Sequence, residues 1–310
     1  MNALVEFPLL ASISDLQQID VEFDAASSAL YWWMRPAGRP CFNAEFLNEV
    51  NDFEGSLERH QGWISHEGRP RQVKVMVFGS RVPGVFNLGG DMSMFIQSIL
   101  RKDRHALEAY SRLCVENMYR RVAGFNCEIS TFSLVQGRAF GGGFECALSS
   151  DVIVAERSAT FSLPEVLFNM FPGMGALSLL ARRIGLSKAE DLVMSGQVYS
   201  AKEMKDIGVV DELVDDGRGR QAIEQIISQR ARRTNTYRAM AAAKRHFMPL
   251  HFDELIKIVG VWVDAAMRLE TRDLRMMARL VRAQDRMLGE RDQSRSKVEE
   301  LYPALAVANA

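Results

Sequence analysis

Short apolar segments alternate with longer amphipathic ones over the first two thirds of the chain. Residues 29–36 and 73–80 are rich in aromatic and β-branched side chains and end at Pro or Gly-Ser, which is typical of buried strands. Residues 43–61 carry apolar side chains at helical spacing, and residues 105–125 form a second amphipathic segment that ends near a glycine. Further strands are predicted at 129–137, 151–156 and 209–214. This alternation favours a parallel α/β arrangement.

The pattern changes after residue 215. Residues 221–297 are helical in pattern almost throughout, with both apolar and charged stripes, and no convincing strand. We therefore predict a core domain over residues 1–215 and a helical region over residues 216–310. The stripes fit subunit packing without specifying the number of subunits.

Composition narrows the possible classes of protein. The formal net charge is −1, so no global field favours nucleic acid or an anionic membrane. No apolar segment approaches the roughly 18 residues of a membrane-spanning helix, and residues 1–20 lack the basic start of a signal peptide. The four cysteines and five histidines show no metal-ligand spacing. We expect a soluble cytoplasmic protein with no metal, no nucleic acid and no membrane partner.

Two glycine loops carry the first chemical signal. Gly89 and Gly90 precede Asp91 and an apolar helical segment, and Gly141–Gly143 follow a predicted strand in the same layout. Glycine lets the backbone approach a ligand closely, and a helix start favours negative charge. Two such loops offer two backbone N–H donors, which could converge on one oxygen as an oxyanion hole. The spacing differs from the G-x-G-x-x-G pattern of dinucleotide sites.

Two acids in apolar surroundings carry the second signal. Glu145 follows the second glycine loop, and Glu165 follows Pro164 within a run of Phe, Leu, Val and Met. Burial would raise the pKa of each carboxyl group and suit it to proton transfer. Each acid alone is equally well explained as a structural or exposed residue. Together with two donor loops, they favour a catalytic site.

The motifs "FNLGGD", "VQGRAFGGGFECALSSD" and "FSLPEVLFNMFPGMGA" resemble the crotonase (enoyl-CoA hydratase/isomerase) superfamily over roughly residues 25–215. The resemblance implies an α/β spiral of repeated ββα units and a trimer or dimer of trimers, assembled through the C-terminal helices, which also cover the active site. It implies that Gly90 and Gly142 supply the oxyanion hole. It also implies that Glu145 and Glu165 are the two catalytic glutamates of the hydratase branch.

Within the superfamily, "NLGGDM", "LPEVLFNMFPGMGA" and the long helical end are similar to bacterial diffusible signal factor synthases. This similarity implies a lyase with thioesterase activity. Such an enzyme dehydrates a 3-hydroxyacyl chain on acyl carrier protein to the cis-2-enoyl thioester, then releases a free fatty acid for quorum sensing. No dissociable cofactor is needed, because the carrier's phosphopantetheine brings the substrate.

For the mechanism, we expect Glu165 to remove the α-proton and a protonated Glu145 to assist loss of the 3-hydroxyl, although the two roles can be exchanged. An acyl chain also needs an apolar tunnel. Near Glu165, the candidate tunnel walls are Met170, Phe171 and Met174, and the resemblance implies Trp262 and Leu280 as lid or tunnel residues. Each of the five is more simply explained as a core residue, because apolar stripes at helical spacing usually are core.

Two basic segments could meet partners. Residues 229–246 could bind the acidic carrier protein, and residues 268–286 could bind the carrier or a sensor protein of the signalling pathway; either segment could instead be a solvated helix face. Two other functions stay open: an acyl-CoA hydratase of fatty-acid oxidation, and a regulatory binding protein on the same scaffold. Preference for acyl-CoA or for acyl carrier protein distinguishes the hydratase from the synthase. The binding protein becomes the main hypothesis only if replacing Glu145 and Glu165 by alanine leaves the biological output intact.

Overall fold

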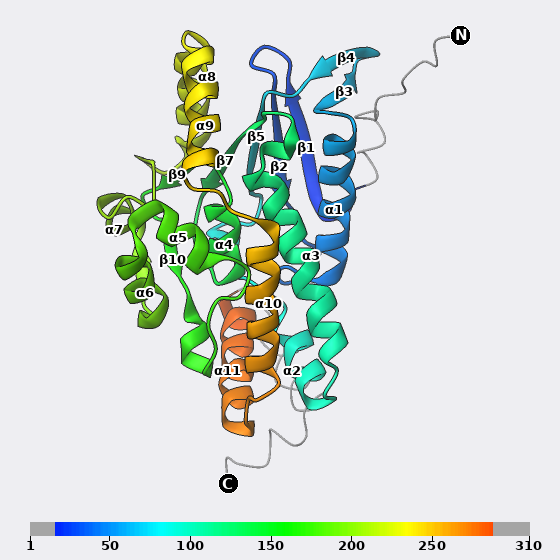
Figure 1. The fold of residues 1–310 in the computed structure, drawn as a ribbon, viewed down its shortest axis with the longest axis vertical. Coiled ribbons are helices and arrows are strands. Elements are labelled where there is room, and N and C mark those ends of the chain that lie inside the picture. The colour runs from blue at the N-terminus through cyan, green and yellow to red at the C-terminus, as the bar shows by residue number, and fades with distance from the viewer. Residues whose placement is uncertain (1–15, 288–310) are drawn as a thin grey trace.

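The computed structural model describes residues 16–287. Its larger sheet has six strands in the order β1-β2-β5-β7-β9-β12, and only β1 runs antiparallel to its neighbour (Figure 1). The strands are β1 (Ile19–Asp24), β2 (Ala29–Met34), β5 (Val75–Ser80), β7 (Ser130–Val135), β9 (Val152–Glu156) and β12 (Glu212–Val214). The five strands predicted from the sequence all lie in this sheet. Their near-continuous apolar character follows from burial on both faces.

A second sheet consists of short strands, two of which lead into the glycine loops. Its order is β11-β10-β8-β6, with β6 and β10 parallel to β8. The strands are β6 (Val85–Asn87), β8 (Arg138–Phe140), β10 (Thr160–Ser162) and β11 (Val198–Ser200), and a separate hairpin pairs β3 (Trp63–His66) with β4 (Arg69–Gln72). Three times, a strand of the large sheet is followed by a strand of the small sheet and then by a helix. This repetition confirms the predicted crotonase spiral of ββα units.

Helices follow each of these strand pairs. Helix α1 (Ala44–Arg59) precedes the first pair and is capped by the side chain of Asn43, which accepts from the N–H of Phe46. The others are α2 (Met92–Leu100), α3 (Arg104–Val122), α4 (Gly142–Leu148), the 3-10 helix η3 (Pro164–Phe168), α5 (Ala176–Ile184), α6 (Leu186–Ser195) and α7 (Ala201–Asp206).

The core continues on both faces of β2. On one face Trp32 stacks on Phe78, with ring centroids 5.5 Å apart. On the other face Tyr31 and Trp33 pack in a smaller cluster that includes Ile223 of α8. These aromatic side chains contribute most to the driving force because each buries a large apolar area.

The described chain after β12 contains helices and no strand: α8 (Gly219–Ala231), α9 (Thr234–Phe247), α10 (Phe252–Ala266) and α11 (Thr271–Met287). Helix α10 packs on α3 and α11 packs on α2, whereas α8 and α9 stand at the opposite end of the molecule (Figure 1). The side chain of Arg39 bonds Asp285 of α11 at 2.6 Å. Within residues 16–287, no helix has the length and apolarity that crossing a bilayer requires. Residues 1–15 and 288–310 lie outside the described residues.

Candidate active site

The first glycine loop joins β6 to α2 and is held by a neighbouring segment. The N–H of Phe42 donates to the carbonyl of Gly89 at 2.8 Å, and Phe42 and Gly90 form a parallel bridge. The hydroxyl of Tyr110 donates to the carbonyl of Phe42 at 2.6 Å. A Cβ at Gly90 would lie 2.7 Å from the ring of Phe95, so only glycine fits there. Asp91 caps α2, as the sequence predicted.

The second glycine loop joins β8 to α4 and lies against the first. Gly141 has φ +50°, and its N–H donates to the carbonyl of Ser162 at 2.8 Å. A Cβ at Gly142 would lie 3.5 Å from the backbone nitrogen of Gly90. In the part of the chain that the structure describes, no backbone hydrogen bond uses the N–H of Gly90 or Gly142. Two uncommitted donors therefore lie side by side, as an oxyanion hole requires.

Glu145 projects from the first turn of α4 into a dry environment. Its side chain is buried, and Oε1 accepts the backbone N–H of Met174 at 2.9 Å and that of Ala176 at 3.0 Å. Burial raises the pKa of Glu145 to about 7, although the two backbone bonds oppose the shift. The two backbone N–H groups therefore stabilise the ionised form of Glu145.

Glu165 approaches from η3. A Cβ at Gly141 would lie 2.7 Å from its Oε1, which explains the glycine before α4. Its Oε2 is buried and has no hydrogen-bond partner among the described residues. Burial and, second, the charge of Glu145 raise the pKa of Glu165 to about 8. No cation contacts either carboxyl group in the described chain, so burial is not offset by a charge partner and each carboxyl group holds a proton more readily than an exposed one.

These groups share one apolar cavity of about 220 Å³. Both glycine loops and both glutamates line it, so the structure brings together the four residues expected to act on substrate. Of the expected tunnel residues, Met174, Trp262 and Leu280 also line the cavity. Met170 is buried in the core and Phe171 is partly buried against it, and neither is among the lining residues.

A second set of residues lines the cavity and was not predicted from the sequence. Phe42 precedes α1, and the others belong to α1 or α3. These residues are Phe42, Phe46, Leu47, Val50, Tyr110, Cys114, Asn117, Met118 and Arg121. Their helical spacing was visible, but a stripe that faces a cavity has the same period as one that faces solid core. The only available signal was the pair of polar positions, Asn117 and Arg121, on an otherwise apolar face.

The basic segment 229–246 lies on α8 and α9 and contributes no residue to the cavity lining. Within the second segment, Asp273 and Asp285 of α11 are buried, so that helix is more than a solvated face. The carrier protein, the sensor and the trimer or dimer of trimers stay predictions. Across residues 16–287, no three or more His, Cys, Asp or Glu side chains gather as a metal site would need.

Comparison with known proteins agrees with this geometry. The family model described as enoyl-CoA hydratase/isomerase matches residues 64–261. Human mitochondrial methylglutaconyl-CoA hydratase is 31% identical over 147 residues, which are 47% of this chain and 41% of that protein. Bovine mitochondrial enoyl-CoA hydratase domain-containing protein 2 is 32% identical over 185 residues, 58% of this chain and 55% of that protein. The chain spans about half the length of the curated relatives it matches.

Solved structures share the fold at low sequence identity. Human mitochondrial delta3-delta2-enoyl-CoA isomerase superposes with a TM-score of 0.70 at 17% identity, covering 89% of this chain and all of that one. DspI of Pseudomonas aeruginosa gives a TM-score of 0.56 at 20% identity, covering 81% of this chain and 92% of that one. Identities this low support the shared fold alone.

Proposed function

Because this chain belongs to the enoyl-CoA hydratase/isomerase family, we propose that it dehydrates a 3-hydroxyacyl chain on acyl carrier protein to the cis-2-enoyl thioester and then hydrolyses that thioester. The product is a free unsaturated fatty acid that serves as a quorum-sensing signal. One observation carries the proposal: two buried glutamates, neither of them paired with a cation in the described chain, lie beside two uncommitted backbone donors in one apolar cavity. The similarity of "LPEVLFNMFPGMGA" and of the helical end to signal synthases supports the finer assignment.

Dehydration begins with the thioester oxygen between the N–H groups of Gly90 and Gly142. These donors stabilise the enolate, which makes the α-proton acidic enough for a carboxylate to remove. Ionised Glu165 takes that proton, and protonated Glu145 gives its own proton to the departing 3-hydroxyl. The products are the enoyl thioester, water, protonated Glu165 and ionised Glu145.

The second step uses the protonation state that the first one leaves. Ionised Glu145 takes a proton from water, whose oxygen attacks the thioester carbonyl while the same two N–H groups hold the tetrahedral anion. The carbon–sulfur bond breaks, and protonated Glu165 gives its proton to the leaving thiolate. Glu145 is again protonated and Glu165 ionised, so one proton shared by two acids closes a two-step cycle.

The hydrogen bonds favour one resting protonation state over the other. Oε1 of Glu145 accepts two backbone N–H groups, whereas Oε2 of Glu165 has no partner in the described chain. These contacts therefore favour a resting proton on Glu165. From the sequence, a protonated Glu145 is the expected starting acid, with the two roles exchangeable. The contacts make protonated Glu145 with ionised Glu165 the less populated form. The proposed hydrolysis regenerates this form at the end of each cycle.

A second candidate function is hydration of a 2-enoyl-CoA. The resting state favours it directly, because an ionised Glu145 activates water and a protonated Glu165 delivers a proton to the α-carbon. The curated relatives named above, which include a hydratase acting on a CoA thioester, also favour it.

Mass spectrometry of the reaction products separates the two functions. The protein is incubated with 3-hydroxydodecanoyl-acyl carrier protein and, separately, with a 2-enoyl-CoA, beside Glu145→Gln and Glu165→Gln. Release of free 2-enoic acid by the wild type alone supports the synthase. An unchanged carrier substrate together with rapid hydration of the enoyl-CoA would establish the second function instead.

A further inference from the structure

The catalytic cavity extends between α1 and α3, beyond the groups that do chemistry. Its lining follows one face of α3, from Tyr110 through Cys114 and Met118 to Arg121. Arg121 lies eleven positions after Tyr110, which is roughly 16 Å along a helix that rises about 1.5 Å per residue. Phe46, Leu47 and Val50 of α1 form the facing wall.

The two ends of the cavity differ in exposure. Leu167 of η3 and Val198 of β11 line the cavity away from α1 and α3 and are 49% and 60% exposed. At the α1–α3 end, Val50 and Met118 are 1% and 4% exposed. A thioester has two arms, a polar carrier and an apolar tail. The carrier arm must reach solvent through the open end, so the closed end is left for the tail.

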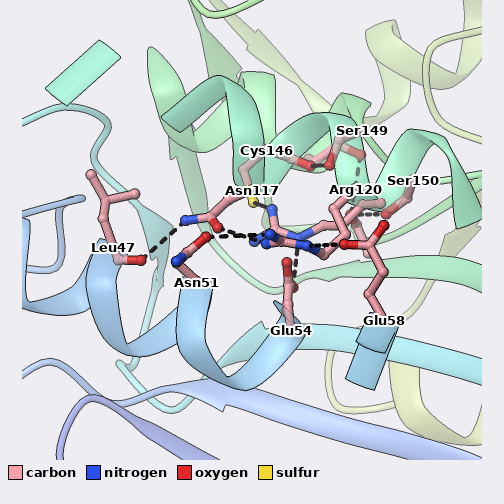
Figure 2. Close-up of polar contacts among 12 residues, drawn as sticks. Leu47, Asn51, Glu54, Glu58, Asn117, Arg120, Cys146, Ser149 and Ser150 are labelled. Atoms are coloured by element: carbon pink, nitrogen blue, oxygen red, sulfur yellow. Dashed lines mark hydrogen bonds and ion pairs between the residues drawn. The ribbon is translucent and has the colours of Figure 1, made fainter. Parts of the chain in front are cut away.

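Arg121 lies at the closed end and is held on several sides. Its Nε donates to Oε1 of Glu54 at 2.7 Å, and its Nη1 donates to Sγ of Cys146 at 3.0 Å. Its guanidinium also lies 5.4 Å from the ring centroid of Trp32 and 5.0 Å from that of Phe78, within cation–π range. In Figure 2, Glu54 of α1 and Cys146 of α4 approach the arginine side chains of α3 from opposite sides, and both bonds described above go to Arg121.

We propose that Arg121 is a specificity-determining residue that closes the tail channel and sets the longest acyl chain the site accepts. The inference rests on the acyl-thioester chemistry proposed above and names the part of the substrate that this channel takes, an unbranched apolar tail. A longer tail would have to separate a buried guanidinium from its buried carboxylate, which is a costly change. The limit should therefore be sharp rather than gradual.

The channel is tested with 2-enoyl thioesters of N-acetylcysteamine in a series of chain lengths. Val50→Phe narrows the channel wall, and Leu280→Phe makes a comparable change on the α11 side of the same cavity. We expect Val50→Phe to lower kcat/KM for the longest substrates about tenfold or more, as blocking a well-fitted apolar pocket does, and to spare the shortest. A shift with Leu280→Phe and none with Val50→Phe would overturn the proposal, because the tail would then lie toward α11.

Arg121 itself is tested without leaving Glu54 unpaired. In Arg121→Met combined with Glu54→Met, a folded protein should accept longer chains than the wild type does. Arg121→Lys keeps an ion pair on a slimmer side chain, and we expect a smaller shift in the same direction. An unchanged length limit in either folded variant would contradict the assignment.

Binding of saturated acyl thioesters, measured by calorimetry over the same lengths, distinguishes this inference from the proposed function. If the wild type binds the series but turns over none of it, the proposed function fails while the length limit can still be read from affinity. If turnover occurs but neither affinity nor rate depends on residue 50 or 121, the inference fails alone.

Discussion

The molecule buries carboxylates in two neighbouring places and compensates them in opposite ways. Glu54 is 0% exposed, and Arg121 meets it at 2.7 Å. Glu145 is 3% exposed and precedes Cys146 on α4, and Cys146 contacts that same arginine. In the described chain, however, neither Glu145 nor Glu165 has a cation partner. Burial raises the pKa of all three acids, and only at Glu54 does a guanidinium act against it.

The comparison separates a structural acid from a reactive one. A buried carboxylate can be balanced by a fixed cation, and it then contributes a rigid and chemically inert contact. It can instead be balanced by a proton, and that proton is then available at neutral pH for transfer. Desolvation alone does not distinguish the two cases; the identity of the compensating group does.

The largest expected effect is the loss of turnover when Glu145 or Glu165 is replaced. Glu165→Gln and Glu145→Gln should each lower kcat by about 10²–10⁴-fold, the usual contribution of a positioned acid or base. Neither should lower the free energy of unfolding near pH 8, because the raised pKa of each acid means that burial disfavours its charged form. Steady-state kinetics and urea denaturation check both statements, and a marked loss of stability with intact kcat would show that these acids are structural.

The ion pair should behave in the opposite way. Glu54→Gln leaves Arg121 without its carboxylate and should cost about 3–5 kcal/mol in free energy of unfolding. A double replacement by apolar residues, Glu54→Met with Arg121→Met, should recover most of that loss. Thermal and urea unfolding of the two variants provide the measurement. A single variant as stable as the wild type would remove the contrast between the two sites.

A smaller loss is expected at the oxyanion hole. Gly142→Pro removes one N–H donor at the first residue of α4, a helix position that tolerates proline, and should lower kcat by about 10²–10³-fold. Gly142→Ala is the matched control, since it keeps the donor and its Cβ would meet no atom closer than 3.4 Å. Equal losses in the two variants would point to a steric effect and against a role for the N–H.

The smallest effect is a trend of stability with pH. Folding raises the pKa of Glu145 from 4.5 to about 7 and that of Glu165 to about 8. The folded state therefore binds more protons than the unfolded state in this range, and these groups make stability fall as pH rises from about 4.5 to 8.

Glu145→Gln should flatten that fall. Glu203 is an exposed control of opposite sign, because hydrogen bonds from Ser200 lower its pKa and its contribution is lost as pH falls. Unfolding measured at several pH values should give opposite trends for Glu145→Gln and Glu203→Gln, each relative to the wild type. Parallel trends would mean that Glu145 is not protonated above its ordinary range.

Much of the site was predictable because its residues break local patterns. Glycine runs before helices, and acids within apolar runs, stand out in a sequence without any tertiary information. The long strands were predictable for a similar reason, since a continuous apolar segment indicates a strand that is buried on both faces.

The rest depends on contacts between distant residues. The strands of the small sheet are three residues each, too short for a period to be read. Glu165 lies in a 3-10 helix of five residues, which is too short for a helical period to show in the sequence. The pairing of Glu54 with Arg121, 67 residues apart, and the two backbone donors to Glu145 arise only from the fold.

The central claim is that Glu145 and Glu165 share one proton near neutral pH, and difference infrared spectroscopy tests it most directly. The carbonyl stretch of a protonated carboxyl group is recorded between the two pKa values of about 7 and about 8. We expect one such band in the wild type, its loss in Glu165→Gln, and its persistence in Glu145→Gln. A wild type with no protonated carboxyl group in that range, with both glutamates ionised, would contradict the account.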